Sequence, residues 1–146
     1  MEFYKYMGYE LLEKIKNKEI TIQEVVQSTF ERIESTDHLL HSYINLSKKS
    51  AVEKAKEYDL DQKKNNPTGS LYGLPFANKD LICIDGFLTT CGSKILEGFR
   101  PPYNAFVIDR LTQQGAIHVG NTNMDEFAMG GSTENSSYGP TYNPWD

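Results

Sequence analysis

The residue best suited to chemistry in this chain of 146 residues is Lys79, which lies between the short apolar runs 74–76 and 81–84. Residues 74–146 contain only one other lysine, Lys94. An amine buried among apolar side chains loses its hydration, which favours the neutral form and lets it accept a proton at neutral pH. The same position also suits a lysine at a strand end that reaches solvent or pairs with Asp80. The residues alone leave both interpretations open.

Other residues that could carry chemistry have patterns that favour structural roles. Cys83 and Cys91 lack Cys-x-x-Cys spacing and a nearby histidine pair, so we expect buried free thiols and no metal site. No histidine has an evident catalytic partner, and no serine of segment 130–137 lies in a Gly-x-Ser-x-Gly elbow. We therefore expect structural and turn-forming roles for His38, His41, His118, Ser132, Ser136 and Ser137. The pair Gly130-Gly131 would let the backbone approach a ligand closely.

Composition excludes several classes of protein. The net charge of −5 and the pI near 5.2 argue against a general nucleic-acid-binding surface. No apolar run approaches the roughly 18 residues that span a bilayer, and the first residues lack the layout of a secretory signal. Two cysteines are too few for a disulfide framework. We expect a cytoplasmic protein without membrane contact.

Periodicity predicts helices first and an α/β layer afterwards. The run Thr21–Glu24 is a capping box, and it precedes an apolar stripe at helical spacing, formed by Ile22, Val25, Val26, Phe30 and Ile33. A short helix is predicted around 11–15 and a polar helix at 48–62, with a half-buried strand at 42–46. In the second half, we expect a helix that Asn104 caps and Gly115 ends, followed by a strand at 117–119. This alternation predicts an α/β fold with parallel strands.

Several motifs together resemble the amidase-signature family. They are GLPFANKD at 73–80, TTCGS at 89–93, GNTNMDEF at 120–127, AMGGSTENS at 128–136 and YGPTYNPWD at 138–146. Within the family, they resemble the branch formed by the A subunits of glutamyl- and aspartyl-tRNA amidotransferases. The match is dense from about residue 71, whereas residues 1–70 agree only in their helical layout. The resemblance therefore implies an N-terminal helical segment at 1–70 and, at 71–146, the first part of an α/β/α sandwich with a mixed sheet.

The resemblance implies a Ser–Ser–Lys triad in which Lys79 is the catalytic lysine. Lys79 would draw a proton from a bridging serine, which activates the nucleophilic serine for attack on an amide carbon. In the family both serines follow the Asn-Pro-Trp-Asp run, so Ser132, Ser136 and Ser137 do not fill these roles. On this basis residues 1–146 hold one third of the triad and are expected to be inactive alone. Met129 is expected to contact the substrate.

The sequence departs from the family pattern at four positions. Asn78 stands where an apolar residue is usual, and Asn121 stands where a lysine is common. Gly131 and Tyr142 replace a serine and an arginine that are common there. We expect Asn78 to make the surroundings of the Lys79 amine more polar.

The resemblance implies a glutaminase that supplies ammonia to convert Glu-tRNA(Gln) to Gln-tRNA(Gln). Its substrate would be glutamine, and its partners would be the B and C subunits of a heterotrimer. No cofactor is expected in this chain, because ATP and Mg²⁺ belong to the B subunit, which also makes most contacts with tRNA. Two alternatives remain: an amidase of the same fold that acts on a free small amide, and a non-catalytic interaction or split-gene fragment.

Overall fold

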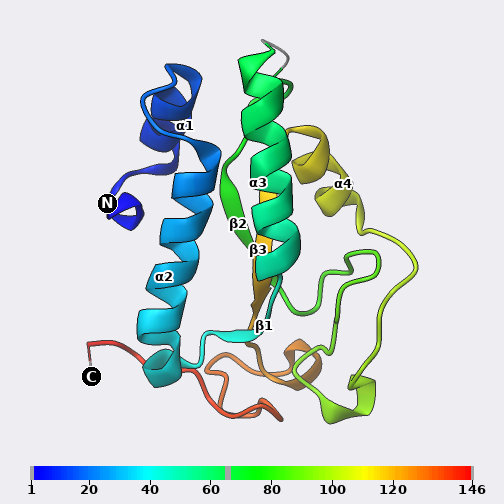
Figure 1. Ribbon diagram of the computed structural model, residues 1–146. Helices are drawn as coiled ribbons and strands as arrows, with labels where there is room; N and C mark the ends of the chain where they lie inside the picture. Colours follow the sequence, from blue (N-terminus) through cyan, green and yellow to red (C-terminus); the bar gives the residue numbers. More distant parts are fainter. Residues whose placement is uncertain (1, 65–66, 146) are drawn as a thin grey trace. The chain divides into compact units, whose positions relative to one another are not determined.

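The computed structural model describes residues 2–64 and 67–145 (Figure 1). Its α-helices are α1 (Gly8–Lys16), α2 (Ile22–Leu40), α3 (Lys48–Lys63) and α4 (Phe106–Gln113). Its strands are β1 (Tyr43–Leu46), β2 (Pro75–Lys79) and β3 (Ile117–Thr122). Three short 3₁₀ helices complete it: η1 (Phe3–Lys5), η2 (Lys94–Leu96) and η3 (Glu126–Ala128). The helices and strands predicted from periodicity are all present.

The chain forms two compact units. Unit 1 contains Met1–Ser35, Ser47–Phe76 and Arg110–Val119, and unit 2 contains Thr36–Leu46, Ala77–Asp109 and Gly120–Asp146. Neither unit is continuous in sequence, and each draws on both sides of residue 70, where the sequence predicts a boundary.

Helix α2, whose residues up to Ser35 belong to unit 1, begins as the capping box predicts. The Glu24 backbone N–H donates to Thr21 Oγ1 at 3.1 Å, and the Thr21 N–H donates to Glu24 Oε2 at 2.8 Å. These bonds satisfy donors that a helix start leaves without an intrahelical partner. The predicted apolar stripe is buried along its whole length, with exposed fractions of 7% or less for Ile22, Val25, Val26, Phe30 and Ile33.

Polar residues of α3 contribute a second set of contacts to unit 1. The Asp59 carboxylate is buried and accepts the backbone N–H groups of Ile22 at 2.8 Å and Gln23 at 3.0 Å, at the first turn of α2. The Gln62 amide donates to the Ile15 carbonyl at the end of α1. Gly73 has a φ of +83°, and a Cβ there would lie 2.6 Å from Ile22. Only glycine fits this close approach without strain.

The three strands form a sheet of order β1-β3-β2. Strand β1 pairs antiparallel with β3, and Asn45 is opposite Asn121. Strands β2 and β3 run in the same direction, because the Ile117 N–H donates to Leu74 at their start and the Asp80 N–H donates to Thr122 at their end. The sheet is therefore mixed, as the family resemblance implies.

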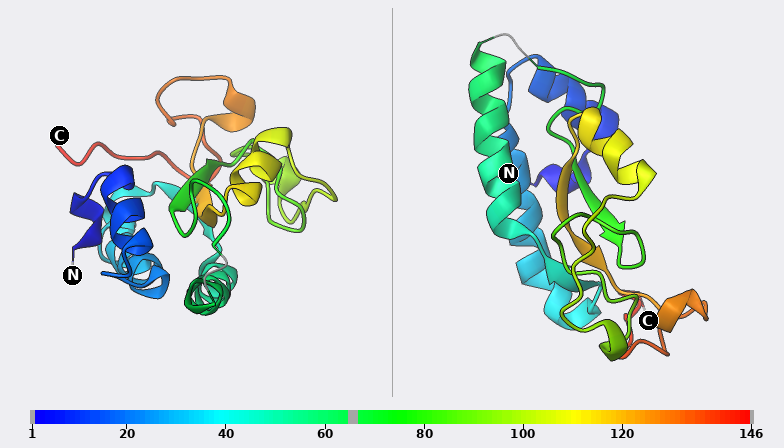
Figure 2. Two further views of the ribbon diagram at one scale, coloured as in Figure 1. Left: turned by 90° about the horizontal axis from the view of Figure 1, so that it is seen from above. Right: turned by 90° about the vertical axis from the view of Figure 1, so that its right-hand side faces the viewer.

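Unit 2 contains little regular structure, and Figure 2 shows the chain from η3 onward continuing without a further helix or strand. The expectation that Asn104 caps α4 is wrong. Its side-chain oxygen accepts the Asp85 N–H at 2.8 Å, and its Nδ2 donates to the Asp109 side chain at 2.9 Å. Helix α4 begins two residues later, at Phe106. Within the described ranges, no helix is both long and apolar enough to cross a membrane.

Candidate active site

Lys79 is the last residue of β2, and its side chain is exposed. Side chains alternate between the two faces of a strand, and here Asn78 and Asp80 are buried at 3% and 0% exposure. Lys79 must therefore project to the opposite face. Of the two interpretations that the residues leave open, the structure therefore has the lysine at a strand end that reaches solvent, and the buried amine is wrong for this structure. No ion pair joins Lys79 to Asp80 among the described residues.

The buried neighbour Asp80 is the centre of a hydrogen-bonded cluster in unit 2. Its Oδ2 accepts the backbone N–H groups of Thr90 at 3.0 Å and Gly92 at 3.3 Å, together with the Thr90 hydroxyl. Its Oδ1 accepts from Asn121 Nδ2 at 3.1 Å. The main chain adds a bond from the Cys91 N–H to the Asp80 carbonyl at 3.0 Å. The carboxylate thus binds β2 to β3 and to the loop 89–93.

Asn121 and Asn78, two departures from the family pattern, contact each other in this cluster. The Asn121 Nδ2 group donates to Asp80 and to the Leu88 carbonyl at 2.7 Å, and its Oδ1 accepts from Asn78 Nδ2 at 3.3 Å. Asn78 Nδ2 also donates to the Ile82 carbonyl at 2.7 Å. The side chain of Asn78 therefore lies within the cluster. The expectation that it surrounds the Lys79 amine is wrong, because Asn78 occupies the other face of β2.

Two residues that follow β3 hold the segment 129–145. The Asp125 carboxylate accepts the backbone N–H groups of Ser132, Thr133 and Asn135 at 2.9–3.0 Å. These bonds, above all those from Asn135 and Thr133, hold the pKa of Asp125 below its ordinary value of 3.8. A Cβ at Gly130 would lie 2.4 Å from the Asp125 carboxyl carbon. The close approach that Gly130 permits is therefore made to this carboxylate.

Asn123 holds the later part of the same segment. Its Nδ2 donates to the Gly139 carbonyl at 2.8 Å and to Thr141 Oγ1 at 3.2 Å. Its Oδ1 accepts the Ser136 hydroxyl at 2.6 Å. Just before the segment, in η3, the Phe127 N–H donates to the Cys91 carbonyl at 2.8 Å. The segment 129–145 therefore lacks helices and strands but is ordered by side-chain hydrogen bonds.

The serines and histidines have local structural contacts. Ser132 and Ser137 donate to Glu134 and Glu126, and the Ser136 hydroxyl accepts the Tyr138 N–H. His118 Nδ1 lies 3.1 Å from the Ser47 hydroxyl, and the ring of His41 packs edge-on against Tyr142. These contacts are of the kind that turn-forming and structural residues make. His38 is partly exposed in the last turns of α2.

The cysteines are free, and only one of them is buried as expected. Cys91 is 9% exposed, whereas Cys83 is half-buried. Burial, with a smaller contribution from the Asp80 carboxylate, raises the pKa of the Cys91 thiol. A raised thiol pKa opposes nucleophilic chemistry at neutral pH. No group of three or more His, Cys, Asp or Glu side chains that could hold a metal ion occurs in residues 2–64 and 67–145.

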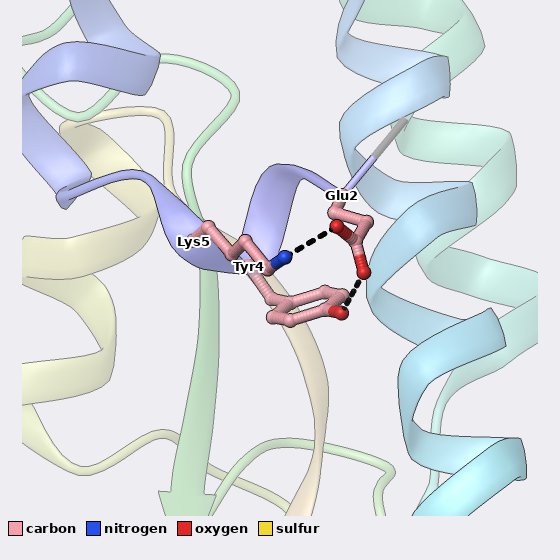
Figure 3. A network of polar contacts seen from close by, with 3 residues as sticks. All are labelled: Glu2, Tyr4 and Lys5. Carbon is pink, nitrogen blue, oxygen red and sulfur yellow. Dashed lines mark hydrogen bonds and ion pairs between the residues drawn. The ribbon is translucent and has the colours of Figure 1, made fainter.

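Unit 1 also contains an exposed polar cluster and two cavities. Figure 3 shows Glu2 accepting hydrogen bonds from the Lys5 amine at 2.5 Å and from the Tyr4 hydroxyl. These side chains are exposed, and such pairs contribute little free energy. Two cavities of about 540 and 550 Å³ are lined by residues of unit 1, and Lys79 is not among them. Met129, the expected substrate contact, is 74% exposed.

Comparisons with known proteins agree in both sequence and structure. A family model described as Amidase matches residues 24–146. The chain is 48% identical to the A subunit of the glutamyl-tRNA(Gln) amidotransferase of Lachnoclostridium phytofermentans, over 100% of this chain and 30% of that protein. The chain therefore spans about 30% of the length of the curated relatives that it matches.

Two solved structures are similar over nearly the whole chain. A bacterial aryl acylamidase of the amidase-signature family has a TM-score of 0.91 at 28% identity, over 97% of this chain and 31% of that one. The A subunit of the glutamyl-tRNA(Gln) amidotransferase of Thermotoga maritima has a TM-score of 0.77 at 32% identity, over 100% of this chain and 29% of that one.

Proposed function

Because this chain belongs to the Amidase family, we propose that it carries the catalytic lysine of a glutamine-hydrolysing amidotransferase. The reaction would supply ammonia for converting Glu-tRNA(Gln) to Gln-tRNA(Gln). The observation that carries this proposal is 48% identity, over the full chain, to the A subunit of a glutamyl-tRNA(Gln) amidotransferase. Support also comes from the place of Lys79, which ends β2 next to a buried network that fixes that strand.

In the proposed mechanism, Lys79 is the proton acceptor at the start of a relay. Its amine takes a proton from a bridging serine, which takes one from the nucleophilic serine. The serine oxygen bonds to the side-chain amide carbon of glutamine. The carbon–nitrogen bond then breaks as the amide nitrogen takes a proton back from the relay and leaves as ammonia. Water then hydrolyses the acyl-enzyme to glutamate. Ser132, Ser136 and Ser137 take no part in this proposal, because their hydroxyls donate to the side chains of Glu134, Asn123 and Glu126.

The relay requires a neutral Lys79 amine, whereas the Lys79 side chain is exposed to water in this structure. The amine must therefore lose water when the site is assembled, since desolvation favours the neutral form. Backbone N–H groups next to the nucleophile would stabilise the oxyanion of the tetrahedral intermediate. Met129, exposed on the loop after η3, is proposed to contact the substrate.

The partners in this proposal are the B and C subunits of a heterotrimer. The B subunit would bind ATP and Mg²⁺ and make most of the tRNA contacts. The net charge of −5 is consistent with this division, because a chain with an acidic surface need not bind the tRNA backbone itself. The reaction would take place in the cytoplasm.

Ammonia release from glutamine tests the role of Lys79 in the full-length natural protein. The variant Lys79→Ala should lose at least about 10³-fold in kcat, because members of a catalytic unit are not replaced by their neighbours. Lys79→Arg should fail equally, since guanidinium stays protonated. Lys94→Ala changes the other exposed lysine of the second half and should keep full activity. Unchanged turnover in Lys79→Ala would remove this residue from the mechanism.

A second candidate function is hydrolysis of a free small amide. It is favoured by the TM-score of 0.91 to the aryl acylamidase, against 0.77 to the Thermotoga maritima protein. The two candidates differ in the leaving group, which is aniline-like in an aryl amide and ammonia in glutamine. The ratio of kcat/KM for glutamine to kcat/KM for an anilide therefore separates them. A preference for the anilide would favour the small-amide amidase.

A further inference from the structure

Both neighbours of Lys79 along β2 are fixed on the buried side of the strand. Asn78 donates to Ile82 and Asn121, and Asp80 accepts from Thr90, Gly92 and Asn121. A rotation of β2 about its axis would carry both side chains out of these bonds. Side chains of adjacent strand residues point to opposite faces, so this restraint also fixes the direction in which Lys79 leaves the backbone.

The hydrogen bonds of this cluster are almost completely satisfied. Both N–H groups of Asn121 Nδ2 and both of Asn78 Nδ2 have acceptors, and both oxygens of Asp80 have donors. When the donors and acceptors of a buried cluster are paired in this way, one arrangement of the side chains is favoured, because any rotation leaves a buried polar group without a partner. The cluster is therefore a rigid support for the end of β2.

Burying a carboxylate at the end of a strand has an unfavourable desolvation free energy. Asp80 is 0% exposed, and no lysine, arginine or histidine among the described residues forms an ion pair with it. Burial of a charge is unfavourable unless hydrogen bonds replace its hydration, and well-packed apolar side chains can stabilise a strand without that penalty. Unlike apolar side chains, the carboxylate makes directional hydrogen bonds, and these fix the orientation of the loop 89–93 and of β3 relative to the end of β2.

We propose that Asp80 is a positioning residue for Lys79. Its carboxylate, tied to Thr90 and Asn121, fixes the backbone at the end of β2 so that the Lys79 amine meets its proton donor in one geometry. Asp80 itself touches neither substrate nor the reacting atoms. This inference rests on the proposed role of Lys79 and adds the residues that would orient its amine.

The hydroxyl of Thr90 offers the mildest way to weaken this support. Thr90→Val removes the hydroxyl bond to Asp80 and keeps a side chain of similar shape. The adjacent Thr89 is a matched control, because it is 1% exposed and its Oγ1 has no hydrogen-bond partner among the described residues. Thr89→Val therefore makes the same chemical change without loosening the cluster.

The test compares kcat and KM for glutamine hydrolysis by the full-length natural protein. Thr90→Val should lower kcat about tenfold to a hundredfold with KM within twofold, since a misplaced catalytic group slows chemistry more than binding. Thr90→Ser keeps the hydroxyl and should return kcat to within about threefold of the parent. Thr89→Val should match the parent. Asp80→Asn should lower kcat more than Thr90→Val. Both oxygens of Asp80 face hydrogen-bond donors, so the amide nitrogen of asparagine would face a donor in either orientation.

The outcomes separate this inference from the proposed function. If Lys79→Ala keeps its activity, the proposed function fails. If Lys79→Ala is inactive while Thr90→Val has normal kcat, only the positioning role of Asp80 is wrong. Equal losses in Thr90→Val and Thr89→Val, or no recovery in Thr90→Ser, would also overturn it. Should Asp80→Asn fail to fold, the threonine series alone decides.

Discussion

The two units are stabilised by different kinds of buried residue. Most buried apolar side chains belong to unit 1, where Phe30, Val25 and Val26 are at most 1% exposed. Most buried polar side chains belong to unit 2, where Asp80, Ser93 and Asn121 have no exposure. Apolar burial is non-directional and tolerates small shifts, whereas hydrogen bonds require defined distances and angles. The part of the chain that presents Lys79 is therefore held mainly by directional hydrogen bonds, which fix the orientation of side chains, and less by apolar burial.

The largest effect should follow removal of the central side chain of unit 1. Phe30→Ala should lower the free energy of unfolding by about 3–5 kcal/mol, because it leaves a cavity among apolar neighbours. Urea denaturation of the full-length protein measures the loss. Phe106→Ala, at an aromatic side chain that is 79% exposed, is the control and should change stability by about 0.5 kcal/mol or less. Similar losses in both variants would contradict an apolar core centred on Phe30.

A smaller loss should follow removal of the buried carboxylate of unit 1. Asp59→Ala leaves the backbone N–H groups of Ile22 and Gln23 without acceptors at the start of α2. Loss of a helix cap of this kind costs about 0.5–2 kcal/mol, which denaturant titration resolves. Asp61→Ala, on the same helix and paired only at the surface with Lys64, should be nearly neutral. If Asp61→Ala costs as much, Asp59 is not a specific cap.

Acid should locally loosen the segment of unit 2 that Asp125 holds. The folded pKa of Asp125 is lowered by the N–H groups of Asn135 and Thr133, so its stabilising contribution is complete above the ordinary value of 3.8. The contribution falls as the pH drops below that value and through the lowered pKa. The protection factors of the Ser132, Thr133 and Asn135 amide hydrogens, which compare each exchange rate with that of an unprotected amide at the same pH, should fall over this range. Asp125→Asn should have low protection factors above pH 3.8 as well, and a pH-independent protection factor in the parent would refute this role.

The smallest effect should be a gain in stability. Thr89→Val removes a buried hydroxyl without a partner among the described residues, so the free energy of unfolding should rise by up to about 1 kcal/mol. Thr90→Val should lower it, because Asp80 loses a donor. Thermal denaturation of both variants gives the two signs. A loss in Thr89→Val as large as that in Thr90→Val would mean that the Thr89 hydroxyl is satisfied.

Helices and strands were predictable because their signals are local. The capping box at Thr21 and Glu24 and the apolar stripe that ends at Ile33 lie within a few turns of each other, and both predictions are confirmed. The cap assigned to Asn104 was wrong because a distant residue, Asp85, competes for its side chain. Cap residues use the same groups that bind elsewhere in the fold, and local spacing does not decide between the partners.

The candidate site was only partly predictable. Motif resemblance singled out Lys79, Asn78 and Asn121, and the structure brings the two asparagines into contact. It did not indicate the role of Asp80, whose bond to Asn121 joins residues 41 positions apart. A useful signal was present nevertheless: a charged residue that follows β2 and shares the face of Asn78 is expected on the buried side once the strand is recognised.

The amino-acid sequence by itself determined the helices of unit 1, the α/β class and the family, because these depend on local spacing and on contiguous motifs. Only the tertiary structure decided that Lys79 faces away from the protein interior while Asp80 and Asn121 meet inside it. The physical reason is that the buried face of β2 and the hydrogen-bond partners of Asp80 depend on which distant segments of the chain lie next to β2. Tertiary packing determines which segments these are.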